Sequence, residues 1–298
     1  MKIGLYLMGL KGLYTLRALL EHTGPSYAGS LVFVVAAKDK NVQNDYFEDI
    51  KSLALDHSIP FFEQDALPVP VKADVVFAIS WRWLIKEDLD KLIVFHDSLL
   101  PKYRGFNPLV TALIEGDREI GVTAIQANHE FDKGNIIAAK STSIAYPIKI
   151  EDAIEQVSLL YGKLAVQLAK LINAGPLTGT VQDEALASYS LWRNEADYHI
   201  NWNGPAERIS RFIDALGYPY NGACTMYDGV KIIVLESSVV KDLPIVNRDA
   251  GKILLIDNNR PVVVCGTGLI KIEAAVYDHN REPVIFNKLR VRLNDPIQ

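Results

Sequence analysis

Strand-like and helix-like segments alternate through the first half of this 298-residue chain, and this alternation limits the fold more than any other feature. Short runs rich in Val, Ile and Phe, typical of strands, occur at Lys2–Met8, Leu31–Ala37, Asp74–Ile79, Leu92–His96 and Gly121–Gln126. Between them, apolar residues follow helical spacing over Leu13–His22, Asp45–His57 and Pro108–Glu115. Such alternation predicts an α/β domain with a mostly parallel sheet.

The second half of the chain changes character. A long helical pattern over Ile150–Ala174 ends at a Gly-Pro stop signal, so we predict that the first domain covers residues 1–176. Residues 177–197 are polar without sustained periodicity and are expected to form a linker across the surface. Beyond a helix at Pro205–Leu216, turn sequences separate five short strand-like runs: Ala223–Met226, Lys231–Glu236, Gly251–Ile256, Val262–Val264 and Leu269–Ala274. This pattern predicts a small antiparallel β-barrel within residues 198–298.

Composition and charge narrow the class of function. With 49% hydrophobic and 22% charged residues, the chain is expected to fold as an ordinary soluble protein. Leu31–Ala37 is far shorter than the roughly 20 apolar residues that span a bilayer, and the N-terminus lacks a signal-peptide pattern. We therefore expect a cytoplasmic protein without a membrane partner. The net charge of −5 and the absence of a Lys/Arg run disfavour nucleic acid and favour small-molecule chemistry.

The cysteines and histidines do not predict a metal site. Cys224 and Cys265 each stand alone in an apolar run, so a disulfide is not expected. The six histidines form no pair at metal-ligand spacing. The expected number of metal ions is therefore none.

The stretch from Val94 to Pro108 carries the most specific chemistry. His96 stands at the carboxyl end of a predicted strand, before a loop rich in Pro and Gly, which is where open α/β sheets bind ligands. Asp132 lies on a turn after the next strand, so we expect the two side chains to converge from neighbouring strand ends. Spacing alone leaves open that His96 is a hydrogen-bonded structural residue. The turn Gly9-Leu10-Lys11-Gly12 has too few glycines for a nicotinamide site and indicates an ordinary strand-to-helix turn.

Several motifs in order now point to a known family. They are His-x-Ser-Leu-Leu-Pro-x-Tyr-Arg-Gly at 96–105, Gly-Asp at 116–117, Gly-Val-Thr at 121–123 and Asp-x-Gly at 132–134. Together they resemble the N10-formyltetrahydrofolate-dependent formyltransferases. Residues 200–202, 211–223 and 264–266 are similar to the C-terminal β-domain of methionyl-tRNA and sugar-nucleotide formyltransferases. The resemblance implies a Rossmann-like catalytic domain, an OB-like C-terminal domain and a homodimer.

The resemblance also implies catalytic roles. His96 would donate to the oxyanion formed when an amine attacks the formyl carbon, and Asp132 would orient His96 and relay a proton. The family carries an Asn two residues before the His, and here that residue is Val94, which cannot donate. Three alternatives follow: Asn107 or Asn128 supplies the amide, His96 acts with backbone N–H groups at a reduced rate, or formyl transfer is lost. Asp97 is expected either to hold the imidazolium or to cap the loop.

The remaining predicted site residues concern the two substrates. For the folate they are Trp81, Trp83, Leu84, Ser98, Leu99 and Gly134, and for the acceptor they are Lys102, Tyr103, Arg104 and Gly105. Aromatic residues at such a sheet edge are also commonly core or rim. Residues 37–49 contain two Lys, no Arg and four acids, which makes a poor phosphate grip and resembles sugar-nucleotide N-formyltransferases. We therefore expect a nucleotide-linked amino sugar of surface-glycan synthesis as acceptor. Initiator tRNA and a binding paralogue without chemistry are the alternatives.

Overall fold

The computed structural model describes residues 1–28, 30–66 and 69–293. These residues group into two compact units. The first unit contains residues 1–109, 118–144 and 152–192, and the second contains residues 110–117, 145–151 and the chain from Arg193 onward. The predicted domain boundaries at 176 and 197 stay predictions, because residues 177–192 group with the first unit by contact rather than standing apart.

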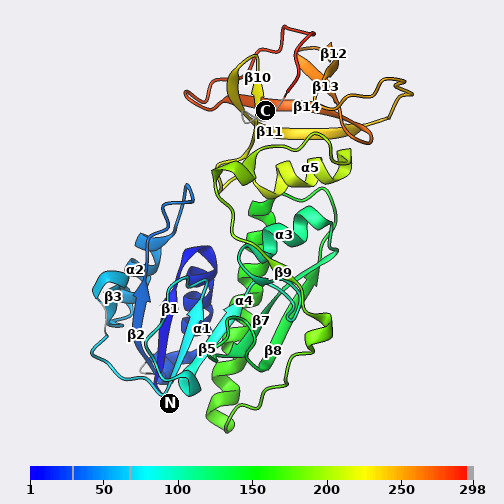
Figure 1. The fold of residues 1–298 in the computed structure, drawn as a ribbon. Coiled ribbons are helices and arrows are strands. Elements are labelled where there is room, and N and C mark those ends of the chain that lie inside the picture. The colour runs from blue at the N-terminus through cyan, green and yellow to red at the C-terminus, as the bar shows by residue number, and fades with distance from the viewer. Residues whose placement is uncertain (29, 67–68, 294–298) are drawn as a thin grey trace. The chain divides into compact units, whose positions relative to one another are not determined.

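A seven-stranded sheet forms the centre of the first unit, in the order β3-β2-β1-β4-β5-β7-β8 (Figure 1). Its strands are β1 (Ile3–Leu7), β2 (Leu31–Ala36), β3 (Phe61–Glu63), β4 (Val75–Ile79), β5 (Leu92–His96), β7 (Glu119–Gln126) and β8 (Ile136–Ser143). The five strands from β3 to β5 are parallel, whereas β7 is antiparallel to both of its neighbours. Every residue of β1 and β4 is buried, as expected for parallel strands covered on both faces. The predicted α/β class is confirmed.

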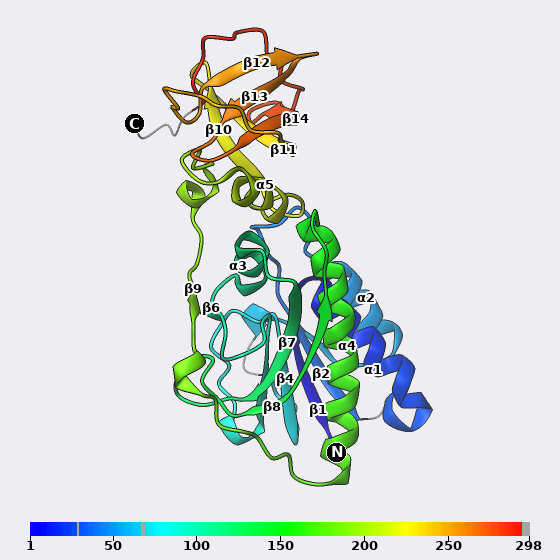
Figure 2. The same ribbon diagram turned by 90° about the vertical axis from the view of Figure 1, so that its right-hand side faces the viewer.

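Three long helices cover one side of this sheet in Figure 2: α1 (Gly9–Ala28), α2 (Phe47–Asp56) and α4 (Ile150–Ala174). The bounds of α4 match the prediction, and α1 begins directly in the Gly9 turn, because Gly12 N already donates to Met8 O. On the other side, β6 (Arg104–Gly105) pairs in parallel with β9 (Tyr189–Ser190). Before residue 193 the chain also forms α3 (Pro108–Glu115) and the 3-10 turns η1 (Gln64–Ala66), η2 (Leu89–Lys91) and η3 (Glu184–Leu186).

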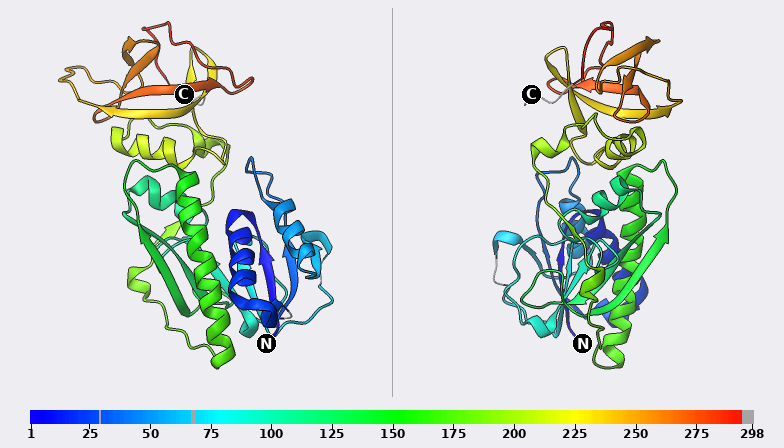
Figure 3. Two further views of the ribbon diagram at one scale, coloured as in Figure 1. Left: turned by 180° about the vertical axis from the view of Figure 1, so that it is seen from behind. Right: turned by 45° about the vertical axis from the view of Figure 1, so that its right-hand side comes forward.

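The second unit contains a five-stranded antiparallel sheet in the order β10-β11-β14-β13-β12, with a yellow-green helix along one face in Figure 3. Its elements are η4 (Glu195–Tyr198), α5 (Ala206–Ala215), β10 (Ala223–Tyr227), β11 (Val230–Val240), β12 (Ile253–Asp257), β13 (Arg260–Val264) and β14 (Leu269–Tyr277). The predicted antiparallel β-domain is therefore confirmed. Within the described chain the edge strands β10 and β12 are not paired with each other, so barrel closure and the OB-like fold stay predictions.

The described residues also bear on the expected membrane, metal and cysteine properties. In that part of the chain no helix is long and apolar enough to cross a membrane. The same residues contain no group of three or more potential metal ligands. Both cysteines are free and buried, and burial raises the pKa of Cys265 to about 12.

Candidate active site

His96 and Asp132 lie together, as the two motifs predicted. His96 is the last residue of β5 and is 8% exposed. Its Nε2 lies 2.8 Å from the carbonyl oxygen of Tyr103, and its Nδ1 lies 3.6 Å from Asp132 Oδ1. Both ring nitrogens therefore face oxygen acceptors.

Asp132 reaches His96 by a route that the sequence did not predict. Strand β7 runs antiparallel to β5, so that His96 pairs with Thr123 and Ile93 pairs with Gln126. The turn after β7 consequently starts at the opposite sheet edge from His96. It must fold back over the sheet for Asp132 to make its contact. The two side chains thus meet as expected, but they do not come from neighbouring strand ends, because that part of the expectation assumed parallel strands.

Two glycines make this folded-back turn possible. A Cβ atom on Gly134 would lie 1.7 Å from Gln126 O, so only glycine fits there. Gly105 has φ +100°, and a Cβ atom on it would lie 2.5 Å from Ser190 O. The Gly105 N–H donates to Asp132 Oδ2 at 2.8 Å. Gly105 and Gly134, predicted for acceptor and folate, therefore have backbone roles in joining the two motifs.

Thr123 of the Gly-Val-Thr motif holds the loop that follows His96. It is fully buried, and its Oγ1 donates to Ser98 O at 2.7 Å and accepts from Leu100 N at 3.0 Å. Ser98 Oγ donates to Lys102 O at 2.5 Å. A Cβ atom on the glycine at 121 would meet Leu99 Cδ2 at 2.6 Å, so this motif packs directly beneath the loop. The Ser98 hydroxyl is thus already engaged within the loop.

Arg104, predicted to bind acceptor phosphates, points into the protein. Its side chain is 1% exposed, and Nε and Nη2 donate to Gln182 Oε1 at 3.1 and 2.8 Å. Glu184 accepts from Nη2 at 2.7 Å, and this hydrogen bond raises the pKa of Arg104 and lowers that of Glu184. Phosphate binding would require these bonds to break. Gln182 carried no signal, since it lies in the segment predicted to be a linker.

The other two predicted acceptor residues differ in exposure. Lys102 is exposed, with Nζ 4.7 Å from the centre of the Tyr103 ring. Tyr103 is half-buried with φ +59°. Its carbonyl oxygen lies 2.8 Å from His96 Nε2, and its N–H donates to the Ser188 hydroxyl oxygen at 3.0 Å. Lys102 is therefore the cationic residue of this loop that faces solvent.

Asp97 takes neither of its expected roles. Its two carboxylate oxygens contact Lys11 Nζ and the Tyr161 hydroxyl, and the side chains of Lys11 and Asp97 are 13% and 17% exposed. Tyr161 comes from α4 and is fully buried. Burial, followed by the charge of Asp97, raises the pKa of Tyr161 well above its ordinary value. Asp97 thus forms an ionic cluster with Lys11 and Tyr161 on the helix side of the sheet and does not hold the His96 imidazole.

Val94 lies in an apolar cluster on the face of the sheet where His96 stands. It packs with buried residues that include Tyr6, Ala78 and Ile85 and with the half-buried Trp81. Burial, followed by the charge of a nearby glutamate, raises the pKa of Tyr6 to about 12. The position that bears the family Asn is therefore apolar in its surroundings as well as in its side chain.

The loop that follows β4, here called the 80s loop, contains the predicted folate residues Trp81, Trp83 and Leu84, and it forms an aromatic edge. The ring of Trp81 meets those of Tyr6 and Trp83 edge-on, with centroid distances of 5.0 and 5.1 Å. Trp81 Nε1 is buried without a hydrogen-bond partner. Trp83 and Leu84 are 40% and 76% exposed. The loop thus offers an unused donor and apolar surface.

Asn107 and Asn128 were proposed as substitutes for the missing amide. Asn107 is half-buried with φ +51°, and Asn128 is exposed with Oδ1 accepting from Glu130 N at 2.8 Å. No hydrogen bond among the described residues joins either side chain to His96 or Asp132. Their role stays a prediction.

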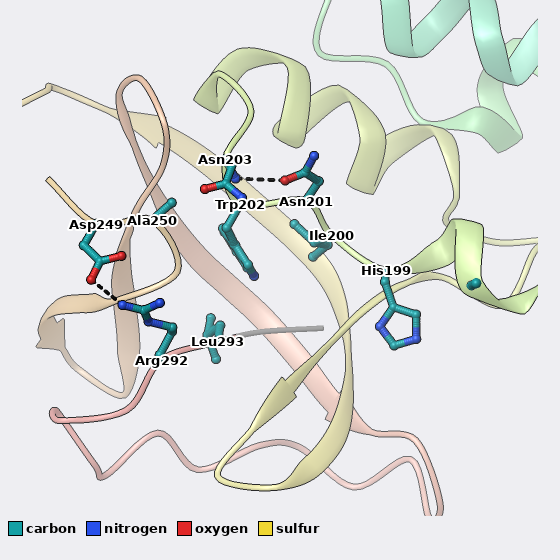
Figure 4. Close-up of a pocket in the computed structure, with 10 residues that line it drawn as sticks. His199, Ile200, Asn201, Trp202, Asn203, Asp249, Ala250, Arg292 and Leu293 are labelled. Carbon is teal, nitrogen blue, oxygen red and sulfur yellow. Dashed lines mark hydrogen bonds and ion pairs between the residues drawn. The ribbon is translucent and has the colours of Figure 1, made fainter. Parts of the chain in front are cut away.

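A pocket of about 400 Å³ lies in the second unit (Figure 4). Polar side chains of His199, Asn201, Asn203, Asp249 and Arg292 line it, and Arg292 pairs with Asp249. None of the residues predicted for catalysis or for the two substrates lines this pocket.

Comparison with known proteins decides the family. The profile of the formyl transferase family matches residues 69–165, and that of the formyl transferase C-terminal domain matches residues 193–282. A methionyl-tRNA formyltransferase of Pseudomonas entomophila is 30% identical over 245 residues, which cover 75% of this chain and 74% of the relative. The chain belongs to the formyltransferase family.

Solved formyltransferase structures share the fold of this one. WlaRD, a sugar 3N-formyl transferase crystallised in the presence of dTDP and 5-N-formyl-THF, has a TM-score of 0.66 at 21% identity, over 97% of this chain and 99% of its own. The N-formyltransferase of Helicobacter canadensis, in complex with folinic acid and dTDP-3-aminofucose, has a TM-score of 0.68 at 16% identity, over 91% and 98%. The recognised family and fold class are thereby confirmed, and with them an enzyme of formyl transfer.

Proposed function

We propose that this formyltransferase transfers the formyl group of N10-formyltetrahydrofolate to the amine of a nucleotide-linked amino sugar. The observation that carries the proposal is the His96–Asp132 pair, at 3.6 Å, in a chain of this family. Acyl transfer to an amine needs a group that moves a proton and a donor that stabilises the oxyanion, and a carboxylate beside an imidazole can supply both.

The folate co-substrate supplies the formyl group, and the chain supplies proton handling and charge stabilisation. Asp132 accepts the proton that the attacking amine loses, through a water molecule, and returns it toward the leaving nitrogen. His96 donates a hydrogen bond to the formyl oxygen as negative charge develops there. Val94 offers no second donor, so another group must complete the charge stabilisation, and the candidates are the amides of Asn107 and Asn128 and a backbone N–H group.

His96 must first change its partner. In this structure Nε2 is 2.8 Å from Tyr103 O, so that donor is occupied. Catalytic hydrogen bonds in substrate-free enzymes often differ from those of the complex and form only when substrate binds. Tyr103 has a left-handed backbone, a strained conformation that a rearrangement of the loop would relieve. Loop movement on substrate binding therefore belongs to the proposal.

The residues of the 80s loop fit a folate. Trp81 has a buried Nε1 without a partner, and Trp83 and Leu84 present exposed apolar surface beside it. A flat heteroaromatic ring with polar edges satisfies both features. Both structural neighbours were crystallised with a folate compound, which supports the same co-substrate here.

Charge near the second strand supports a sugar nucleotide over tRNA. Lys38 lies 3.6 Å from Glu48 and above the ring of Phe47, and Asp39 pairs with Arg82. Lys38, from the segment 37–49, and Arg82, from the 80s loop, therefore each lie beside an acidic side chain. An RNA-binding surface needs several unpaired cations. Both neighbours were also crystallised with dTDP or a dTDP-amino sugar.

The test is an end-point assay by mass spectrometry. The protein is incubated with N10-formyltetrahydrofolate and a panel of dTDP-, UDP- and GDP-linked amino sugars. We expect a formyl mass gain on one member, absent with His96→Asn. No gain on any member would overturn the proposal, and thermal stabilisation by one of the amino-sugar nucleotides without product would indicate a binding paralogue.

Methionyl-tRNA formylation is the second candidate, because a relative that is 30% identical carries that name. It predicts binding of initiator tRNA whose affinity falls steeply with salt. Formylation of charged initiator tRNA by the same preparation, with no gain on any sugar, would select this candidate. We further propose a homodimer, which light scattering of the full chain would test.

A further inference from the structure

We propose that Gln182 is a positioning residue for Asp132, and that the buried pair it forms with Arg104 holds the two catalytic motifs in register. This inference rests on the proposed function. It assigns a catalytic consequence to a residue outside both motifs, in a segment whose composition predicted only a linker.

The amide of Gln182 bonds to both motifs at once. Its Oε1 accepts two hydrogen bonds from Arg104, which directly follows Tyr103 in the His96 loop. Its Nε2 donates to Asp132 O at 2.7 Å and to Gly134 O at 2.8 Å. All four hydrogen-bonding positions of the amide are thereby used. The side chain is 5% exposed, so water does not substitute for any of these bonds.

The pair is anchored to rigid structure. Thr180 exchanges two backbone hydrogen bonds of 2.8 Å with Ile136, at the start of β8. Beyond Gln182, Ser188 accepts from Arg104 N at 2.8 Å, and Ser190 accepts from Phe106 N at 3.0 Å. Gln182 therefore lies between an attachment to the sheet and an attachment to the loop.

The Asp132 turn needs an external support. It has left the ladder of β7 and β8, and Asp132 itself has φ +58°, a conformation that costs of the order of 1 kcal/mol for a residue other than glycine. The Gln182 amide binds the carbonyl oxygen of this strained residue and that of Gly134, two residues further along the turn. Among the residues that the structure describes, the Asp132 side chain itself is held toward His96 by the Gly105 N–H.

The discriminating variant is Gln182→Glu. A carboxylate keeps the bonds to Arg104 but cannot donate to Asp132 O or Gly134 O, and it places an oxygen against them. The matched control is Glu184→Gln, which alters the exposed partner of Arg104 and leaves the two bonds of Gln182 to the Asp132 turn in place. We expect kcat of Q182E to fall about 10–100-fold with KM for both substrates within about threefold, and E184Q to match wild type.

A double-mutant cycle separates positioning from a general structural role. If Gln182 acts through Asp132, then Q182E/D132N should be no slower than D132N within about threefold, because the positioned group is already lost. Multiplied effects would overturn the inference. Should Q182E fail to fold in a thermal melt, Gln182→Asn, which keeps the amide on a shorter side chain, replaces it in the same cycle.

A crystal structure of the folded Gln182 variant makes the inference independent of the reaction. We expect the His96 Nδ1 to Asp132 Oδ1 distance, 3.6 Å here, to lengthen and the turn to shift. Normal kcat and an unmoved turn in an active enzyme would overturn the inference and leave the proposed function standing. If wild type forms no product with any acceptor, the proposed function fails, and the crystal distance alone decides whether Gln182 positions Asp132.

Discussion

His96 and Asp97 are consecutive residues, yet they belong to two ionic groups of different construction. His96 faces the side of the sheet covered by loops, where Asp132 lies 3.6 Å away and a backbone carbonyl holds the other nitrogen. Asp97 faces the helices, where Lys11 and Tyr161 contact both of its oxygens directly. Successive side chains of a strand point to opposite faces, so a single register creates both groups.

The two groups teach how a site differs from a structural cluster. The Asp97 group is satisfied by its own members, because Lys11 and Tyr161, which come from packed helices, bond to both oxygens of Asp97. In the His96 group the distance between the charged partners is longer, at 3.6 Å. The group lies on turns with positive φ at Tyr103 and Asp132, and it depends on a backbone donor, Gly105 N, from another segment. Loose, strained and externally supported groups are the ones that can exchange protein contacts for substrate.

The largest effect is expected where the loop-side group is broken. Asp132→Asn keeps an oxygen that accepts from Gly105 N but removes the charge and the proton acceptor. We expect turnover to fall about 10²–10³-fold with Tm little changed, and His96→Asn to behave alike. Near-normal steady-state turnover of either variant in the mass-spectrometric assay would contradict the assignment.

The same substitution on the helix side should have the opposite outcome. Asp97→Asn removes the anion from a mostly buried Lys11 and leaves that cation uncompensated. We expect a loss of about 3 kcal/mol in the free energy of unfolding and less than about tenfold in kcat. Denaturant titration measures the first quantity, and adding Lys11→Met should then cost little more. A stable D97N protein with abolished turnover would erase the distinction between the two groups.

Val94→Asn sharpens the comparison on the loop side. Because Val94 packs in an apolar cluster with Tyr6 and Ile85, an unpaired amide there should cost about 1–2 kcal/mol of stability. We expect turnover to stay level or fall, since the surroundings are built for an apolar group. A rise in kcat would instead mean that only the side chain has diverged from the family, with the oxyanion position intact.

The smallest effect concerns Glu184 and depends on pH. The hydrogen bond to Arg104 lowers the pKa of Glu184 from an ordinary 4.5. The ion pair therefore stabilises the folded protein fully above pH 4.5, and this stabilisation is lost as the pH falls through the lowered, folded-state pKa. The Tm of Glu184→Gln should therefore lie slightly below that of wild type at pH 7. The two melting curves should coincide in strong acid. A difference that persists there would point to a contact other than the ion pair.

Much of the local structure could be predicted because it depends on neighbours in the chain. Apolar runs located β1, β2, β4 and β5 within about two residues, and helical spacing located α4 to the residue. Strand β8 was missed because its edge position leaves alternate residues exposed and polar, and β3 has only three residues. Of the site, the sequence pointed to His96 and Asp132 through their motifs.

The sequence by itself determined the α/β class, the antiparallel C-terminal domain and the two motifs, because periodicity and turn residues act over a few positions. Only the tertiary structure decided which side chains meet. Arg104 bonds to Gln182 across 78 positions and Lys11 to Asp97 across 86, and neither contact has a local pattern. The antiparallel direction of β7 likewise decided how Asp132 reaches His96, because strand direction follows from how the whole sheet packs rather than from the strand's own residues.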